Sequence, residues 1–125
     1  MHKIIVFISL VLFSFPILAT DGNALIVNIK NAIKYMESPS NYGSTSNFVD
    51  SVHLIGKVKG VLSTVKFSKA ALNSSLFCPP DMIDVTQSLR VILKFAEDTP
   101  GMLHFSEDDL IIIALSKAWP CANNV

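Results

Sequence analysis

Two cysteines are the residues of this sequence best suited to covalent chemistry. Cys78 is followed directly by Pro79 and Pro80, and Cys121 directly follows Pro120. The two cysteines lack the C-x-x-C spacing of redox pairs. A structural zinc ion usually takes four ligands, whereas the chain has three histidines and one of them, His2, lies in the N-terminal segment. The pattern therefore predicts a structural Cys78–Cys121 disulfide, which contributes about 4 kcal/mol in the chain-entropy model.

The remaining reactive side chains form no recognisable catalytic motif. Cys78 with His53 or His104 would make a thiol nucleophile and its base, but no nucleophile motif surrounds the cysteine. His104 with Glu107 and Asp108 could bind a metal weakly, although a loop histidine beside an acidic helix start is the commoner arrangement. No G-x-S-x-G turn, phosphate loop, haem motif or dinucleotide turn is present. We therefore expect a protein that is not an enzyme and needs no cofactor.

The N-terminus has the three parts of a secretory signal peptide. Lys3 supplies a positive start, residues 4–15 form an apolar run, and Ala19 is a small residue suited to cleavage. The run is shorter than the roughly 20 apolar residues of a membrane helix. We expect residues 1–19 to be removed, with an uncleaved anchor as the alternative, and residues 20–125 to remain without a stable membrane anchor. Export also favours the disulfide, because paired cysteines oxidise outside the cytoplasm.

Length and charge narrow the class of protein. The chain has 125 residues, of which 50% are hydrophobic, and its formal net charge is zero. This length suits one domain with one core. A nucleic-acid partner would require a strongly basic face, which the balanced charge does not suggest.

Four segments show the periodicity of helices: residues 21–38, 47–72, 85–98 and 106–119. Expected N-caps are Ser46 or Asn47 for the second segment, Asp84 or Thr86 for the third, and Ser106 for the fourth. No segment alternates strongly enough to predict a strand. We therefore predict an all-α, single-domain bundle of four main helices with one disulfide. Its apolar stripes are Leu25, Ile29, Ile33 and Met36, then Phe48, Val52, Ile55, Val58, Leu62 and Val65, then Leu89, Leu93 and Ala96, and last Leu110, Ile113 and Ala114.

Two glycines lie four residues apart in the second segment. Gly56 and Gly60 each lower helix propensity by about 1 kcal/mol. Their spacing predicts the close approach of another helix, from this chain or from a second one. The flanking Lys57 and Lys59 exclude a membrane span for this segment.

The order of motifs in the second half of the chain is similar to that of a known family. Gly56 to Gly60 are followed by Cys78 to Pro80, Asp98-Thr99-Pro100, Leu103-His104 and Pro120-Cys121. In this order and spacing the sequence resembles the Rap/Tai family of small periplasmic immunity proteins. The resemblance implies an all-helical, disulfide-bonded, non-catalytic protein that blocks a peptidoglycan amidase effector of type VI secretion, often as a homodimer.

Two loops could contact such a partner. Residues 98–109 form a short loop braced by Pro100, with Met102, Leu103, His104 and Phe105 as candidate contacts, although Leu103 and Phe105 could equally plug the core. Residues 38–47 form a longer polar loop that presents Tyr42. The alternative functions are a periplasmic stress chaperone similar to HdeA and an envelope protein with no dedicated effector.

Overall fold

The structure is a computed structural model that describes residues 21–41 and 44–122. These residues form four helices: α1 (Gly22–Glu37), α2 (Thr45–Leu72), α3 (Val85–Asp98) and α4 (Glu107–Ala118). Two single 3-10 turns, η1 (Pro39–Asn41) and η2 (Pro100–Met102), follow α1 and α3. Within the described ranges no strand forms, and the one β-bridge joins Asp21 to Ser106. The predicted all-α fold is confirmed, whereas the predicted signal peptide and Tyr42 lie outside the described residues.

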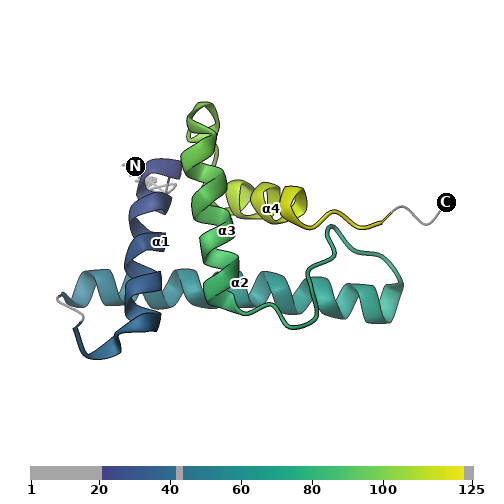
Figure 1. The fold of residues 1–125 in the computed structure, drawn as a ribbon, viewed down its shortest axis with the longest axis horizontal. Helices are drawn as coiled ribbons and strands as arrows, with labels where there is room; N and C mark the ends of the chain where they lie inside the picture. Colours follow the sequence, from purple (N-terminus) through teal and green to yellow (C-terminus); the bar gives the residue numbers. More distant parts are fainter. Residues whose placement is uncertain (1–20, 42–43, 123–125) are drawn as a thin grey trace, which may run out of the picture.

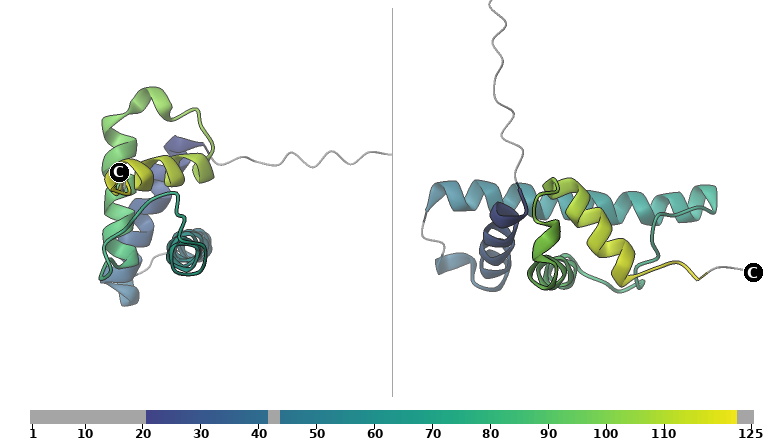
Figure 2. Two further views of the ribbon diagram at one scale, coloured as in Figure 1. Left: turned by 90° about the vertical axis from the view of Figure 1, so that its right-hand side faces the viewer. Right: turned by 90° about the horizontal axis from the view of Figure 1, so that it is seen from above.

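The helices form two crossed layers rather than a bundle of parallel rods. α1 and α3 lie side by side in opposite directions, and α2, the longest helix, crosses behind both of them (Figures 1 and 2). α4 packs against α3 on the side away from α1. Two ion pairs match the antiparallel order of α1 and α3: Lys30 with Glu97, and Glu37 with Arg90. None of the described helices is long and apolar enough to cross a membrane.

Side-chain caps determine where each helix begins. The carboxylate of Asp21 accepts the N–H of Ala24 at 3.0 Å, which caps α1. Asp84 caps α3 in a capping box with Gln87, and Ser106 caps α4, as predicted. The prediction for α2 is wrong, because Ser44 rather than Ser46 or Asn47 is its N-cap. The helix therefore begins at Thr45, earlier than expected from the apolar periodicity.

The core lies where the two layers meet. α1, α3 and α4 bury the centres of their predicted stripes, including Leu25, Ile29, Leu89 and Leu110. Phe77, in the linker between α2 and α3, is also fully buried, which sequence periodicity did not reveal. A linker aromatic in the core anchors this irregular segment, because its ring removes a large apolar area from water.

The first turns of α2 correct the predicted stripe. Ser51 and Leu54 are buried there, whereas Phe48 and Val52 are 41% and 43% exposed. From Val58 onward the predicted residues face the core, as expected. α1 crosses this half of α2 and determines which side of its first turns is buried. The number of apolar residues on a side of the helix does not decide it.

Candidate functional site

The disulfide joins the linker to the end of α4, as predicted. Cys78 and Cys121 are bonded, with their Cα atoms 4.8 Å apart. Beside the bridge the N–H of Cys78 donates to the carbonyl oxygen of Trp119 at 2.8 Å. Because both cysteines are in the bridge, neither is a free thiol, and the alternative of a Cys78 nucleophile with His53 or His104 is contradicted.

The loop from Asp98 to Asp109 is held at both ends by hydrogen bonds. At its start the hydroxyl of Thr99 donates to the carbonyl oxygen of Phe95 at 2.5 Å. In its middle the N–H of Gly22 donates to the carbonyl oxygen of Leu103 at 2.9 Å. At its end Ser106 pairs with Asp21 in the isolated bridge. These contacts tie the loop to the start of α1, so its conformation is already ordered before any partner binds.

The four predicted contact residues of this loop divide into two pairs. Met102 packs against the hydrophobic core, and Leu103 is half-buried beside Gly22. His104 and Phe105 are exposed, and their ring centroids lie 4.4 Å apart. We call this pair the His104–Phe105 tip. The tip is the most exposed part of these four residues, and Phe105, at 38% exposure, does not plug the core.

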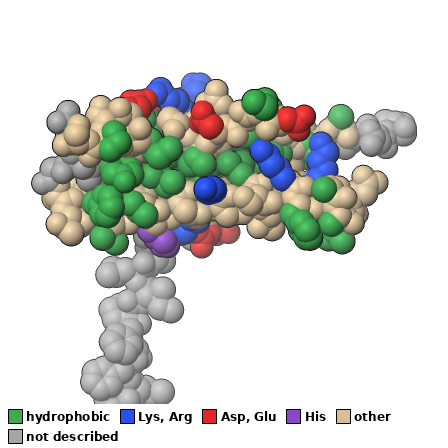
Figure 3. Space-filling view, turned by 90° about the horizontal axis from the view of Figure 1, so that it is seen from below, with side chains coloured by type: hydrophobic (Ala, Val, Ile, Leu, Met, Phe, Trp, Pro, Cys, Tyr) green, Lys and Arg blue, Asp and Glu red, His purple; other side chains and the backbone are tan. Residues whose placement is uncertain are grey.

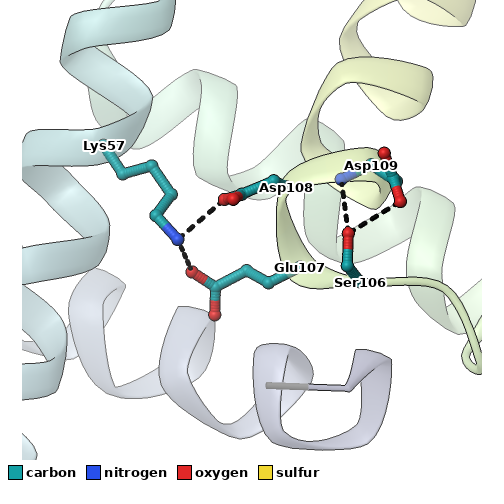
Figure 4. A network of polar contacts seen from close by, with 5 residues as sticks. All are labelled: Lys57, Ser106, Glu107, Asp108 and Asp109. Atoms are coloured by element: carbon teal, nitrogen blue, oxygen red, sulfur yellow. Dashed lines mark hydrogen bonds and ion pairs between the residues drawn. The ribbon is translucent and has the colours of Figure 1, made fainter. Parts of the chain in front are cut away.

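The acidic residues after the loop form ion pairs within the protein. The ammonium of Lys57 on α2 lies 2.7 Å from Oε1 of Glu107 and 2.8 Å from Oδ1 of Asp108, both in the first turn of α4 (Figure 4). Asp109 accepts the hydroxyl of Ser106 at 2.7 Å. The sequence did not predict the link between Lys57 and α4, because fifty residues separate the partners.

The ion cluster of Lys57, Glu107 and Asp108 changes the pKa of the lysine. Burial alone lowers the pKa of Lys57, but its hydrogen bonds to Asp108 and Glu107 and their negative charges outweigh burial and raise the pKa above the ordinary value of 10.5. Glu107 is itself almost fully buried, so it depends on the ammonium for compensation of its charge.

The weak metal site considered for His104, Glu107 and Asp108 has no geometric support. Among the described residues no group of three histidine, cysteine, aspartate or glutamate side chains is placed to hold an ion. Glu107 and Asp108 instead converge on Lys57 (Figure 4).

The two glycines of α2 face open space within this chain. A Cβ atom added at Gly56 or Gly60 would meet no atom within 4 Å. Among the described residues no helix of the same chain packs directly on the two glycines, which contradicts that half of the prediction. Both glycines line a shallow groove of about 330 Å³ with Val61, Leu76 and Ile112. Approach of a second chain to this face stays a prediction.

An apolar patch lies on the underside of the molecule, at the end where α1 finishes and α2 begins (Figure 3). The exposed apolar side chains of these segments are Met36, Phe48, Val49 and Val52, which we call the α2 entry patch. The ring of Phe48 also contacts Tyr35 of α1 edge to face, with centroids 5.3 Å apart. Helical periodicity predicted Met36, Phe48 and Val52 to be buried, so the sequence did not indicate this patch.

Together these features define a small, disulfide-linked helical protein with an ordered loop that presents an exposed aromatic pair. A family model described as Rap1a immunity proteins matches residues 23–121. The chain therefore belongs to the Rap1a immunity protein family, as its resemblance to the Rap/Tai proteins predicted. No curated protein and no solved structure matches it significantly.

Proposed function

We propose that this protein is a periplasmic immunity protein that binds and inhibits a peptidoglycan amidase delivered by type VI secretion. Membership of the Rap1a immunity family supports a protein effector as the partner and a role without catalysis. The amidase and the periplasm are suggested by the Rap/Tai resemblance and by the signal-like sequence of residues 1–19. The observation that carries the binding mode is the ordered loop from Asp98 to Asp109.

The His104–Phe105 tip is the proposed contact with the effector's active-site cleft. Its backbone is tied to α1 through Gly22 and to the core through Met102, so little conformational entropy remains to be lost on binding. An exposed aromatic ring on a rigid support is typical of residues that dominate binding energy. The imidazole adds a polar group that can donate to or accept from the cleft.

Co-expression with each exported amidase of the same genome tests the inhibition. The protein should prevent lysis, and the purified pair should form a complex in which the amidase no longer cleaves peptidoglycan. Phe105→Ala should weaken binding by about tenfold or more, because a central aromatic contact is removed. Met82→Ala is the matched control, since Met82 is 92% exposed on the linker and outside the tip.

Two results would contradict the proposal. The first is that no exported amidase of that genome is bound or inhibited. The second is that the protein suppresses aggregation of acid-unfolded proteins, which would favour the chaperone similar to HdeA.

Export is part of the same proposal. Cleavage after Ala19 should leave a mature chain that begins at Thr20. Intact-mass measurement of the periplasmic protein tests this, and a mass that retains residues 1–19 would contradict it.

A homodimer is also proposed, because the groove along Gly56 and Gly60 and the α2 entry patch are both largely apolar and are not covered by other described residues. Light scattering of the purified protein gives the molar mass directly. A mass of one chain at all concentrations up to the millimolar range would contradict the dimer.

A further inference from the structure

A second groove lies between α3 and α4. Its volume is about 650 Å³, and its floor consists of Val91, Phe95 and Ala114. This volume is within the range of sites that hold a ligand or several side chains. The groove does not include the His104–Phe105 tip, so it is a separate surface from the one proposed above.

The rim of this groove is cationic although the whole chain is neutral. Arg90, Lys94 and Lys117 line it, with Asp98 as the one carboxylate among the described lining residues. Arg90 is already paired with Glu37, and Lys94 is paired with Asp98 at 2.7 Å. The groove therefore retains an excess of positive charge.

Lys117 is the cation of this rim that lacks an acidic partner. Within residues 21–41 and 44–122 no carboxylate lies at ion-pair distance from its ammonium, which instead lies 5.6 Å from the centroid of the Phe95 ring. This cation–π contact places the charge directly over the apolar floor. An occupant of the floor would thus come close to an unpaired ammonium.

We propose that this groove docks a segment of the partner protein in which an apolar side chain neighbours an aspartate or glutamate. The apolar side chain would cover Val91 and Phe95, and the carboxylate would pair with Lys117. A wholly apolar occupant would desolvate the ammonium without compensating it, and a basic occupant would be repelled by the rim. The inference rests on the proposal that the protein acts by binding another protein, but it does not require that partner to be an amidase.

A random dodecapeptide display library is the probe, because it presents all such segments without assuming an effector. Selection on the oxidised protein should enrich peptides with an aromatic or aliphatic residue next to Asp or Glu. Amide chemical shifts of the labelled protein should move around Val91, Phe95 and Lys117 when a selected peptide is added. The same peptide with Lys in place of its acidic residue should bind at least about tenfold more weakly, because like charges then meet at the rim.

Two variants of the protein test separately the charge of the rim and the space in the groove. Lys117→Glu should reduce the affinity for a selected peptide by about tenfold, and Ala118→Phe should reduce it by filling the groove without a change of charge. Lys69→Glu is the matched control, because Lys69 is also an exposed lysine in the last turn of a helix but does not line this groove. Thermal melting of each variant shows that the fold is retained.

The inference is overturned if no peptide is enriched, if the shifts fall outside the groove, or if Lys117→Glu binds selected peptides as tightly as the unchanged protein. If selected peptides bind in the groove but the protein inhibits no amidase, the inference about the groove is supported. The proposed function is then contradicted. If no peptide is enriched and Lys117→Glu binds an amidase as well as the unchanged protein does, the inference about the groove is overturned. The proposed function would still hold.

Discussion

Lys57 links α2 to the first turn of α4. Its ammonium neutralises Glu107, which is 7% exposed, and also reaches Asp108 (Figure 4). A nearly buried carboxylate without a cation nearby is strongly unfavourable, because it has lost most of its hydration. The same contacts fix the start of α4, and thereby the end of the loop that carries the His104–Phe105 tip.

Lys57→Met should lower the free energy of unfolding by about 1–3 kcal/mol, because it leaves the charge of Glu107 uncompensated. Urea denaturation followed by circular dichroism measures the change. Lys59→Met is the matched control on the same helix, and its exposed side chain should change stability by less than about 0.5 kcal/mol. Equal losses for the two variants would show that the ion cluster does not stabilise the fold.

The contribution of this ion cluster to stability should depend on pH. Since the pKa of Lys57 is raised above 10.5 in the folded state, its stabilising contribution is complete below that pH and is lost as the pH rises through the folded-state value. The difference in unfolding free energy between the unchanged protein and Lys57→Met should therefore shrink above pH 10.5. A difference that grows with pH in this range would contradict the assignment.

At the scale of elements, α2 has one covered half and one open face. Its first turns are covered by α1, whereas a Cβ added at Gly56 or Gly60 would meet no atom of the described residues within 4 Å. The periodicity of α2 predicted the helix and its buried centre, but could not tell which side of the first turns α1 would cover. The polar Ser51 is buried there while Phe48 and Val52 are exposed, so the choice depends on where the crossing helix lies.

Gly56→Ala and Gly60→Ala should each raise the unfolding free energy of a single chain by about 0.5–1 kcal/mol, because alanine favours a helix and nothing lies within 4 Å of the added carbon. Gly22→Ala is the contrasting variant, since its Cβ would lie 2.7 Å from Cα of Leu103, and it should destabilise the protein. Chemical denaturation at low protein concentration measures all three. A loss of stability in Gly60→Ala, together with dissociation of an assembly, would show instead that a second chain packs on this face.

At the scale of the whole molecule, the disulfide and Phe77 hold the linker and the C-terminal segment against the helices. The bridge joins residues separated by 43 positions, and the buried ring of Phe77 directly precedes Cys78. A covalent link over such a long segment reduces the conformational entropy of the unfolded chain. The irregular linker is thereby kept in place without regular secondary structure of its own.

The double variant Cys78→Ala with Cys121→Ala should lose about 2–5 kcal/mol of stability, the usual range for a native bridge in a small exported domain. Denaturation with and without a reductant provides the comparison: the reductant should reproduce the loss in the unchanged protein and have no effect on the double variant. Equal stability of oxidised and reduced protein would contradict a structural role for the bridge.

The sequence by itself determined those features that depend on residues close together in the chain or on a unique chemical pair. Helical periodicity, the caps Asp84 and Ser106 and the pairing of the two cysteines are of this kind, because a cap acts within one turn and two cysteines allow one bridge. The tertiary structure decided which face each element covers. In α2, Ser51 is buried in place of Phe48, and Lys57 lies beside Glu107. In the loop, Met102 and Leu103 are partly buried, whereas the tip is exposed. These outcomes depend on where distant helices cross, because burial and charge compensation are set by neighbours in space rather than in sequence.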